Sequence, residues 1–135
     1  METLLQKKSL QNNSSKNIMG YINFVWSIYF KVREIHWNER NQATHKLADE
    51  VMSSLIDYQD FIMECNMGMF GIPGYDIFSI TNINSNDLKE LLTNLRTKTL
   101  EVKSSMSGII YSGLTKILDD LVADINKWIY LSENK

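Results

Sequence analysis

Two histidines and three carboxylates stand at spacings that favour a metal site. The segment HWNERNQATHKLADE contains both histidines of the chain, His36 and His45, and Asp49 follows the second one helical turn later. Asp60 and Glu64 repeat the i, i+4 spacing further along. Imidazole and carboxylate ligands without a thiolate suit iron, manganese or zinc. These five residues are therefore the candidate metal ligands.

Four of these residues share one face of a predicted helix but not one position along it. With about 100° per residue and Asp49 at zero, His45 lies near −40°, Asp60 near +20° and Glu64 near +60°. At about 1.5 Å per residue, His45 and Glu64 are roughly 28 Å apart along the axis. One ion cannot contact both, so a single chain does not complete the site.

A two-fold axis would bring the two ends together. When two copies of this helix run antiparallel across such an axis, facing residues have numbers with a constant total. The pair 45 and 64 has the same total as the pair 49 and 60. His45 would then face Glu64 of the second copy and Asp49 would face Asp60, near the small Ser54. Each residue alone is more typical of a solvated or structural position, but the shared face and register favour a metal site.

Composition predicts one soluble domain. The chain has 135 residues, of which 44% are hydrophobic, and a net charge of −2. That balance does not require a nucleic-acid or anionic-lipid partner. No apolar run reaches the roughly 18 to 20 residues of a membrane span, the N-terminus does not read as a secretory signal, and Cys65 has no second cysteine to pair with. We therefore expect a cytoplasmic protein, or a virion-associated one if a phage encodes it, with no membrane partner.

Hydrophobic periodicity predicts four helices around one core. Apolar residues recur every three or four positions, and Pro73 is the only proline. The predicted helices run from near Ser15 to His36, from Gln42 to Asn66, from Leu88 to Met106 and from Leu114 to Leu131. Asp87 followed by Glu90 favours a capping box at the third helix. We expect residues 1–14 to be a flexible tail and residues 15–135 to form an all-α, ferritin-like antiparallel four-helix bundle with a long crossover between helices two and three.

One family combines these features in the same order. The chain resembles the Dps family, the ferritin-like DNA-binding proteins from starved cells, and also short, divergent relatives of that family in phages. The resemblance rests on an H-W-N motif at the end of the first helix and on a second His followed by Asp at +4, Asp at +15 and Glu at +19. The matching residues are His36, Trp37, Asn38, His45, Asp49, Asp60 and Glu64. The ending DINKWIYLSEN is similar in pattern to the family's aromatic C-terminal helix.

The resemblance implies iron chemistry between subunits. It implies that His36, His45, Asp49, Asp60 and Glu64 form a ferroxidase site that oxidises ferrous iron with peroxide or oxygen. It also implies a homo-oligomeric shell, in the family a dodecamer, that stores iron and protects against oxidative damage. Trp37 is expected to be a core aromatic beside the site. The acidic residues of the fourth helix are expected to form a solvated face rather than an ion path; they are Asp119, Asp120 and Asp124.

Three alternatives stay open. The chain could be a ferritin-like structural or assembly protein whose metal site is vestigial or holds manganese or zinc. It could instead be a small binding module that docks a partner through the apolar, glycine-rich loop of residues 67–83, which needs a cover. DNA binding is a weaker expectation, because Lys7, Lys8 and Lys16 form only a thin version of a lysine-rich tail.

Overall fold

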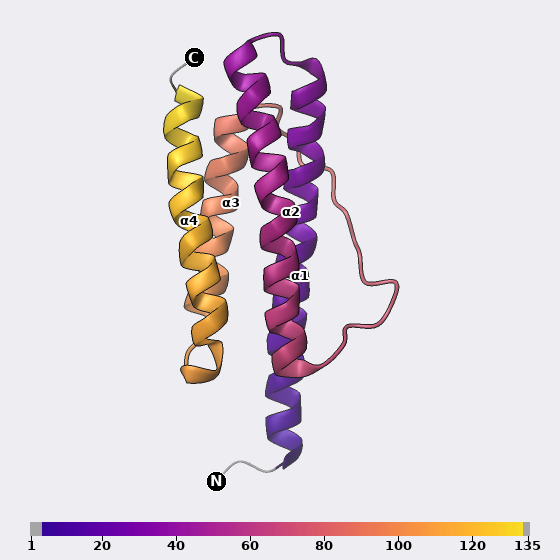
Figure 1. Ribbon diagram of the computed structural model, residues 1–135. Helices are drawn as coiled ribbons and strands as arrows, with labels where there is room; N and C mark the ends of the chain where they lie inside the picture. Colours follow the sequence, from indigo (N-terminus) through magenta and orange to yellow (C-terminus); the bar gives the residue numbers. More distant parts are fainter. Residues whose placement is uncertain (1–3, 134–135) are drawn as a thin grey trace.

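The computed structural model describes residues 4–133, with side chains from residue 15 onward, and this part of the chain contains helices and no strand. The elements are α1 (Leu4–Asn38), α2 (Gln42–Phe70), α3 (Leu88–Ser104), the 3₁₀ turn η1 (Ile109–Tyr111) and α4 (Ser112–Glu133). They pack side by side as one bundle (Figure 1). The prediction of an all-α four-helix bundle is confirmed.

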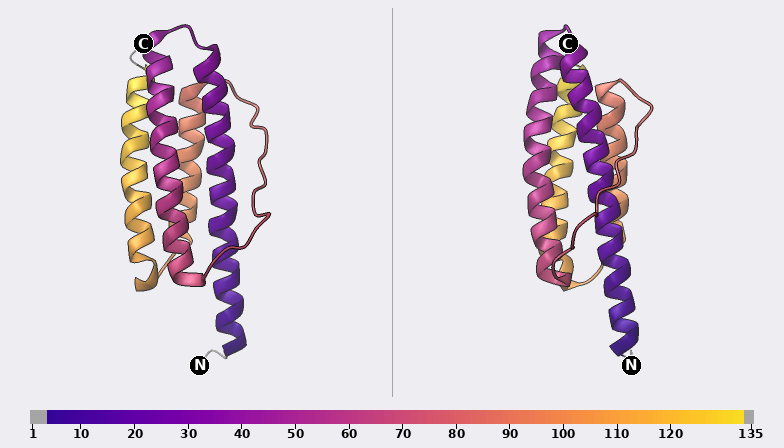
Figure 2. Two further views of the ribbon diagram at one scale, coloured as in Figure 1. Left: turned by 45° about the vertical axis from the view of Figure 1, so that its right-hand side comes forward. Right: turned by 90° about the vertical axis from the view of Figure 1, so that its right-hand side faces the viewer.

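Two helical hairpins make the bundle. A short turn joins α1 to α2, and η1 with its flanking residues joins α3 to α4 (Figure 1). Between the hairpins the chain crosses the length of the bundle as an extended segment, residues 71–87, which we call the crossover. It runs along the outside of α1, so α2 and α3 point in the same direction (Figure 2). At its N-terminal end α1 continues past the ends of the other helices (Figure 2).

Two helix boundaries differ from the predicted ones. α1 begins at Leu4 rather than near Ser15, because no glycine or proline interrupts the chain before Gly20. α2 continues past Asn66, its predicted end, through Gly68 to Phe70, and Gly71 is its C-cap. The φ of +93° at Gly71 suits glycine, and its backbone N–H caps the helix on the Met67 carbonyl at 2.8 Å. The division of the chain into a tail and a bundle domain stays a prediction.

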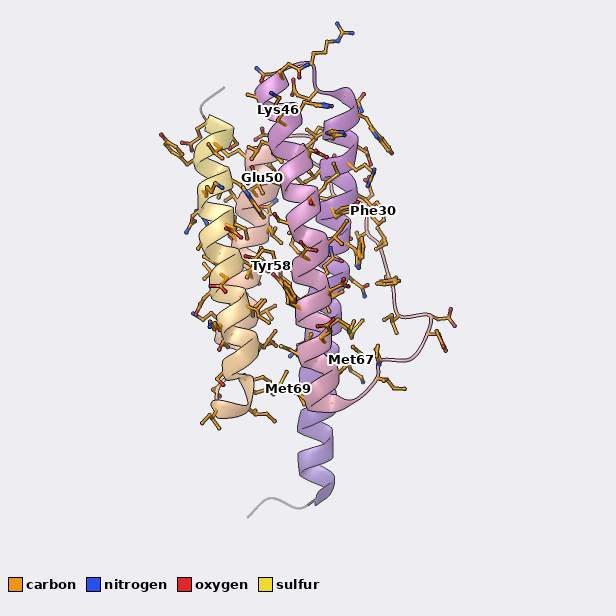
Figure 3. All side chains as sticks on the ribbon, viewed as in Figure 1. Phe30, Lys46, Glu50, Tyr58, Met67 and Met69 are labelled. Carbon is orange, nitrogen blue, oxygen red and sulfur yellow. The ribbon has the colours of Figure 1, made fainter. Side chains whose placement is uncertain are left out.

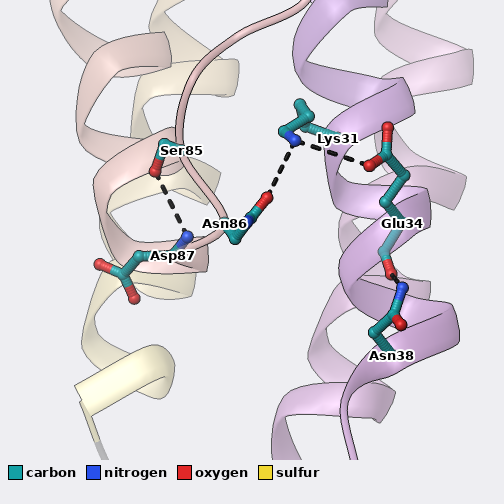
Figure 4. A network of polar contacts seen from close by, with 6 residues as sticks. All are labelled: Lys31, Glu34, Asn38, Ser85, Asn86 and Asp87. Atoms are coloured by element: carbon teal, nitrogen blue, oxygen red, sulfur yellow. Dashed lines mark hydrogen bonds and ion pairs between the residues drawn. The ribbon is translucent and has the colours of Figure 1, made fainter.

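The start of α3 is capped by Asp87 as predicted, but only half of the predicted capping box forms. The Asp87 side chain accepts a hydrogen bond from the Glu90 backbone N–H at 3.2 Å. The Asp87 N–H does not use the Glu90 carboxylate, as a full capping box would, but donates to Ser85 Oγ at 3.3 Å (Figure 4). A side chain from the crossover therefore supplies the second half of the cap.

All four helices contribute to a single apolar core. The largest fully buried side chains are Trp128, Tyr21, Ile18, Ile22, Ile28, Leu55, Ile62, Leu91, Leu92, Leu95, Leu114 and Leu118. Within residues 4–133, no helix has the combination of length and apolar character that crossing a bilayer requires.

One buried polar pair links α1 to α3. The Thr99 hydroxyl donates to the Leu95 carbonyl at 2.7 Å, so Tyr21 must donate its own hydrogen to Thr99 Oγ1, also at 2.7 Å. Burial raises the pKa of Tyr21 far above its ordinary value, and the bond to Thr99 only partly offsets this. The phenol is therefore a neutral donor that fixes the register of the two helices.

A polar stripe on α1 holds the crossover in place. The Asn23 amide makes two bonds to one stretch of extended backbone: it donates to the Ile77 carbonyl at 3.2 Å and accepts from the Ser79 N–H at 3.1 Å. One turn later, Ser27 Oγ accepts from the Thr81 N–H at 3.0 Å. These side chains take the place of a neighbouring strand for a segment that would otherwise leave its backbone groups to water.

The stripe continues to Lys31, which is 9% exposed. Its ammonium donates to Asn86 Oδ1 at 2.9 Å and lies 3.5 Å from the Glu34 carboxylate (Figure 4). A buried cation needs such partners. The Asn38 side chain in turn donates to the Glu34 carbonyl at 2.8 Å. The end of the crossover is thus tied to the last turns of α1.

Removing the Asn23 amide should loosen the crossover. For Asn23→Ala we expect amide hydrogen exchange at Ser79 to rise about tenfold, and the free energy of unfolding to fall by about 1–2 kcal/mol, because two hydrogen bonds are lost. Asn17→Ala, an exposed position on the same helix, is the control. Unchanged exchange at Ser79 would show that the crossover does not depend on this clamp.

The crossover leaves apolar side chains uncovered in the single chain. Phe78 meets Trp26 edge-on, with ring centroids 6.0 Å apart, but Ile72 is 87% and Tyr75 96% exposed. We expected the apolar side chains of this loop to be covered, but the described helices of the same chain do not cover Ile72 and Tyr75.

Candidate metal centre

The turn between α1 and α2 brings the two histidines into contact. His36 lies in the last turn of α1 and His45 in the first turn of α2. The turn is short because Asn41 caps α2, its side chain accepting from the Thr44 N–H at 3.1 Å. The two imidazole rings stack, with centroids 4.0 Å apart and an angle of 21° between their planes.

Each imidazole is oriented by the other residue's backbone. His45 Nδ1 lies 2.8 Å from the His36 carbonyl oxygen, and His36 Nδ1 lies 3.3 Å from the His45 carbonyl oxygen. A carbonyl only accepts, so each Nδ1 carries a hydrogen, and in the neutral imidazole each Nε2 keeps its lone pair. This is the arrangement that orients a histidine for metal ligation. The His36 carbonyl belongs to the last turn of α1, so His45 also caps that helix.

A cavity of about 280 Å³ opens beside the histidines. Its lining residues come from the outer faces of α1 and α2; they are Tyr29, Arg33, His36, Trp37, Asp49, Met52, Ser53 and Ile56. Asp49 is exposed, and His45 stacks on His36. Two of the five predicted ligands, His36 and Asp49, therefore line one cavity, and a third, His45, contacts His36.

Asp60 and Glu64 lie elsewhere on α2. Both are exposed, further along the helix from the cavity that His36 and Asp49 line. No group of three or more His, Cys, Asp or Glu side chains is arranged to hold a metal within residues 4–133 of a single chain. The two halves of the predicted ligand set are both solvent-accessible, but one chain does not bring them together.

The surface between the two halves is partly apolar. Ile56 is 40% exposed and sits between Asp49 and Asp60 on the outer face of α2. In the proposed antiparallel register, two residues face each other when their numbers add up to the total of 49 and 60. Residues 53 and 56 meet this condition. Ile56 would therefore face the small Ser53 of a second copy. Ser54 is expected near this axis, and the match of Ile56 with Ser53 adds a second small residue there.

The opposite side of α2 has a different character. Figure 3 shows Glu50 and Tyr58 on the side of α2 that faces α4, with Phe30 on α1 near the crossover. Glu50 pairs with Lys127 at 3.3 Å, and the Tyr58 hydroxyl donates to Asp124. Desolvation, followed by that hydrogen bond and the charge of Asp124, raises the pKa of Tyr58 well above its ordinary value. These contacts join the two hairpins and leave the cavity side of α2 uncovered.

The acidic residues of α4 are mostly solvated, as expected. Asp119 is exposed and pairs with Lys103 of α3, and Asp120 is exposed. Asp124 differs, because it is half-buried and accepts the Tyr58 hydrogen bond. It has a packing role between α2 and α4.

Trp37 is not a core aromatic, and that prediction was wrong. Its side chain is 68% exposed. It follows His36 directly and so points about 100° further round the helix, away from the core. The Arg33 guanidinium carbon lies 5.7 Å from the Trp37 ring centroid and 5.3 Å from that of Tyr29, whose hydroxyl accepts a hydrogen bond from Arg33.

Sequence reasoning missed this aromatic–arginine ladder, although its signal was present. Tyr29, Arg33 and Trp37 stand at i, i+4 and i+8, which places them in one row on a helix. They border the cavity that His36 and Asp49 also line.

Comparison of the chain with protein-family models, with curated proteins and with solved structures gives no match. Functional conclusions therefore depend on the chemistry of the side chains.

Proposed function

We propose that this protein is a Dps-like, ferritin-like ferroxidase that binds and stores iron and works as a homo-oligomer. The observation that carries the proposal is the stacked pair His36 and His45, whose Nδ1 atoms are both used by backbone carbonyls, together with the cavity that His36 and Asp49 line. Asp60 and Glu64 lie on the same face in the matching two-fold register. Two nitrogen and three carboxylate ligands suit ferrous and ferric iron.

In the proposed dimer, two copies of α2 run antiparallel across a two-fold axis. Each of two identical sites takes His36, His45 and Asp49 from one copy and Asp60 and Glu64 from the other. The partly exposed Ile56 would be buried at the centre, where it gains a partner surface. A dodecameric shell would be built from such dimers.

Iron is the substrate of the proposed reaction. Two ferrous ions each lose one electron, and hydrogen peroxide accepts both as its O–O bond breaks. With two waters this gives two FeOOH units and four protons, so atoms and charge balance. The carboxylates would hold the hard ferric product and the histidines would favour binding of the softer ferrous ion. Consuming ferrous iron and peroxide together suppresses hydroxyl radicals and so protects against oxidative damage.

Loss of the two distal carboxylates should abolish the reaction. Iron(II) is added anaerobically to the Asp60→Ala/Glu64→Ala variant, then peroxide, and near-ultraviolet absorbance is followed. We expect wild-type protein to form a soluble ferric species rapidly and the variant to react no faster than buffer. Glu50→Ala/Asp57→Ala removes the same charge from the same helix without touching the proposed site, and should keep the activity.

Equal rates for wild type, both variants and buffer would refute a ferroxidase. Tight binding of zinc or manganese by the wild type, lost in Asp60→Ala/Glu64→Ala, would then favour a site for another metal. A gel-shift assay with duplex DNA addresses the weaker DNA expectation, to which the exposed Lys16 contributes. Lys7 and Lys8 lie outside the part of the chain whose side chains are described.

The crossover favours a second candidate, a ferritin-like assembly protein. Its exposed Ile72 and Tyr75 are suited to a partner surface. For the double substitution Ile72→Ser/Tyr75→Ser we expect loss of higher assembly if this candidate is right, with iron oxidation retained. Unchanged assembly would exclude a docking role for these two residues.

A further inference from the structure

Arg33 is the one arginine or lysine that lines the cavity beside the histidines. Its guanidinium is fixed in position, because it stacks between Tyr29 and Trp37 and donates to the Tyr29 hydroxyl. An arginine has five N–H donors, so most of them remain for other acceptors. Among residues 4–133 Arg33 takes part in no ion pair: the pairs found there join Lys31, Lys89, Lys103 and Lys127 to carboxylates.

A fixed cation beside a cation site needs an explanation. Each proposed site gathers the three carboxylates of Asp49, Asp60 and Glu64, which carry a charge of −3. A divalent ion would offset most of this charge. Without metal, the three like charges would meet at a half-buried interface, where repulsion is stronger than in bulk water. Arg33 is the one fixed positive charge in the cavity that can offset it.

We infer that Arg33 is the counter-charge that holds this interface together when the site contains no metal, through an ion pair with Asp60 of the second copy. The inference rests on the proposed function, because it uses the two-fold register. In that register Asp60 of the second copy faces Asp49, and Asp49 and Arg33 line one cavity. Stacking pre-organises the guanidinium, so little side-chain entropy is lost when the pair forms.

Arg33 is a positioning residue, not a metal ligand. It keeps the distal carboxylates in place before the ion arrives, and it also competes with the ion for Asp60. Neutralising it should therefore weaken the metal-free dimer but not the metal-loaded one. A residue that only packs against Tyr29 and Trp37 would weaken both.

The test is the dimer dissociation constant of Arg33→Gln, measured by sedimentation equilibrium with chelator present. At about 0.02 M salt we expect it to rise at least about tenfold over wild type, and at about 0.5 M salt to return close to wild type, because salt screens the repulsion. Zinc, a redox-inert probe, should restore the dimer at low salt. Arg33→Lys keeps the charge and should stay near wild type. Arg96→Gln, which removes a charge from α3, should have no effect.

Three results would overturn the inference. The first is a wild-type-like dimer for Arg33→Gln at low salt without metal. The second is equal weakening at both salt concentrations with no rescue by zinc, which would assign Arg33 to packing alone. The third is a wild-type protein that is monomeric and binds zinc no better than Asp60→Ala/Glu64→Ala; this would also overturn the proposed function, whereas the first two leave it intact.

Discussion

Two inactive variants should recover iron oxidation when they are mixed. His45→Ala/Asp49→Ala lacks the proximal half of the proposed site, and Asp60→Ala/Glu64→Ala lacks the distal half. Each homodimer has no intact site. In a heterodimer the two damaged halves meet at one end, while the two intact halves meet at the other, because the interface is two-fold symmetric.

The expected size of the recovery follows from counting. Random mixing makes half of the dimers heterodimers, each with one intact site of two, so about one quarter of wild-type activity should return. The two variants are co-expressed with different affinity tags, the doubly tagged species is purified, and ferrous-iron oxidation is measured. That purified heterodimer should show about half of the wild-type rate.

The matched control mixes two variants damaged in the same half. His36→Ala and His45→Ala cannot complement each other, because every site formed in their heterodimer lacks one histidine. Recovery in this control would contradict the shared site. If the mixed proximal and distal variants form heterodimers but regain no iron oxidation, the chemistry takes place within one chain or at another surface.

Truncating Trp128 should cost more stability than any surface change on its helix. Trp128 is 1% exposed in the core, whereas Tyr130 on the same helix is 63% exposed. Removing a buried aromatic ring loses its transfer free energy and leaves a cavity, so we expect Trp128→Ala to lower the free energy of unfolding by about 3–5 kcal/mol. Domains of this kind have about 5–15 kcal/mol in total.

Urea unfolding followed by circular dichroism measures this difference. Tyr130→Ala is the control and should change the free energy of unfolding by about 0.5 kcal/mol or less. Similar midpoints for the two variants would mean that Trp128 is not packed as described.

Much of the fold could be predicted because helices and cores leave periodic patterns. The stripe Leu114, Leu118, Leu121 and Ile125 repeats every three or four residues and is fully buried. The predicted end of the second helix at Asn66 was too early, because the one glycine that follows, Gly68, costs a helix only about 1 kcal/mol and packing of the surrounding turns outweighs it. The two hydrogen bonds from the Asn23 side chain to the crossover were not predictable, since they depend on where a distant extended segment lies.

The candidate site was predictable in its residue types but not in its local geometry. The short turn between α1 and α2 contains Asn41, which caps α2. The contact between the His36 and His45 rings follows from this turn. The exchange of Nδ1 hydrogen bonds depends on side-chain rotamers that no spacing rule provides. All five residues remain predictions as ligands, and the partners of Asp60 and Glu64 would come from a second copy.

The crossover joins two hairpins, and only the first carries candidate ligands, so under the proposed function the two would tolerate sequence change differently. All five candidate ligands and the Arg33 ladder belong to α1 and α2, while α3 and α4 supply packing surface and the contacts that hold the bundle. Selection for chemistry would therefore act on the first hairpin, and the second would be constrained only by shape and apolar character. Divergence among relatives would accumulate in the second hairpin, and descent would be traced through the first.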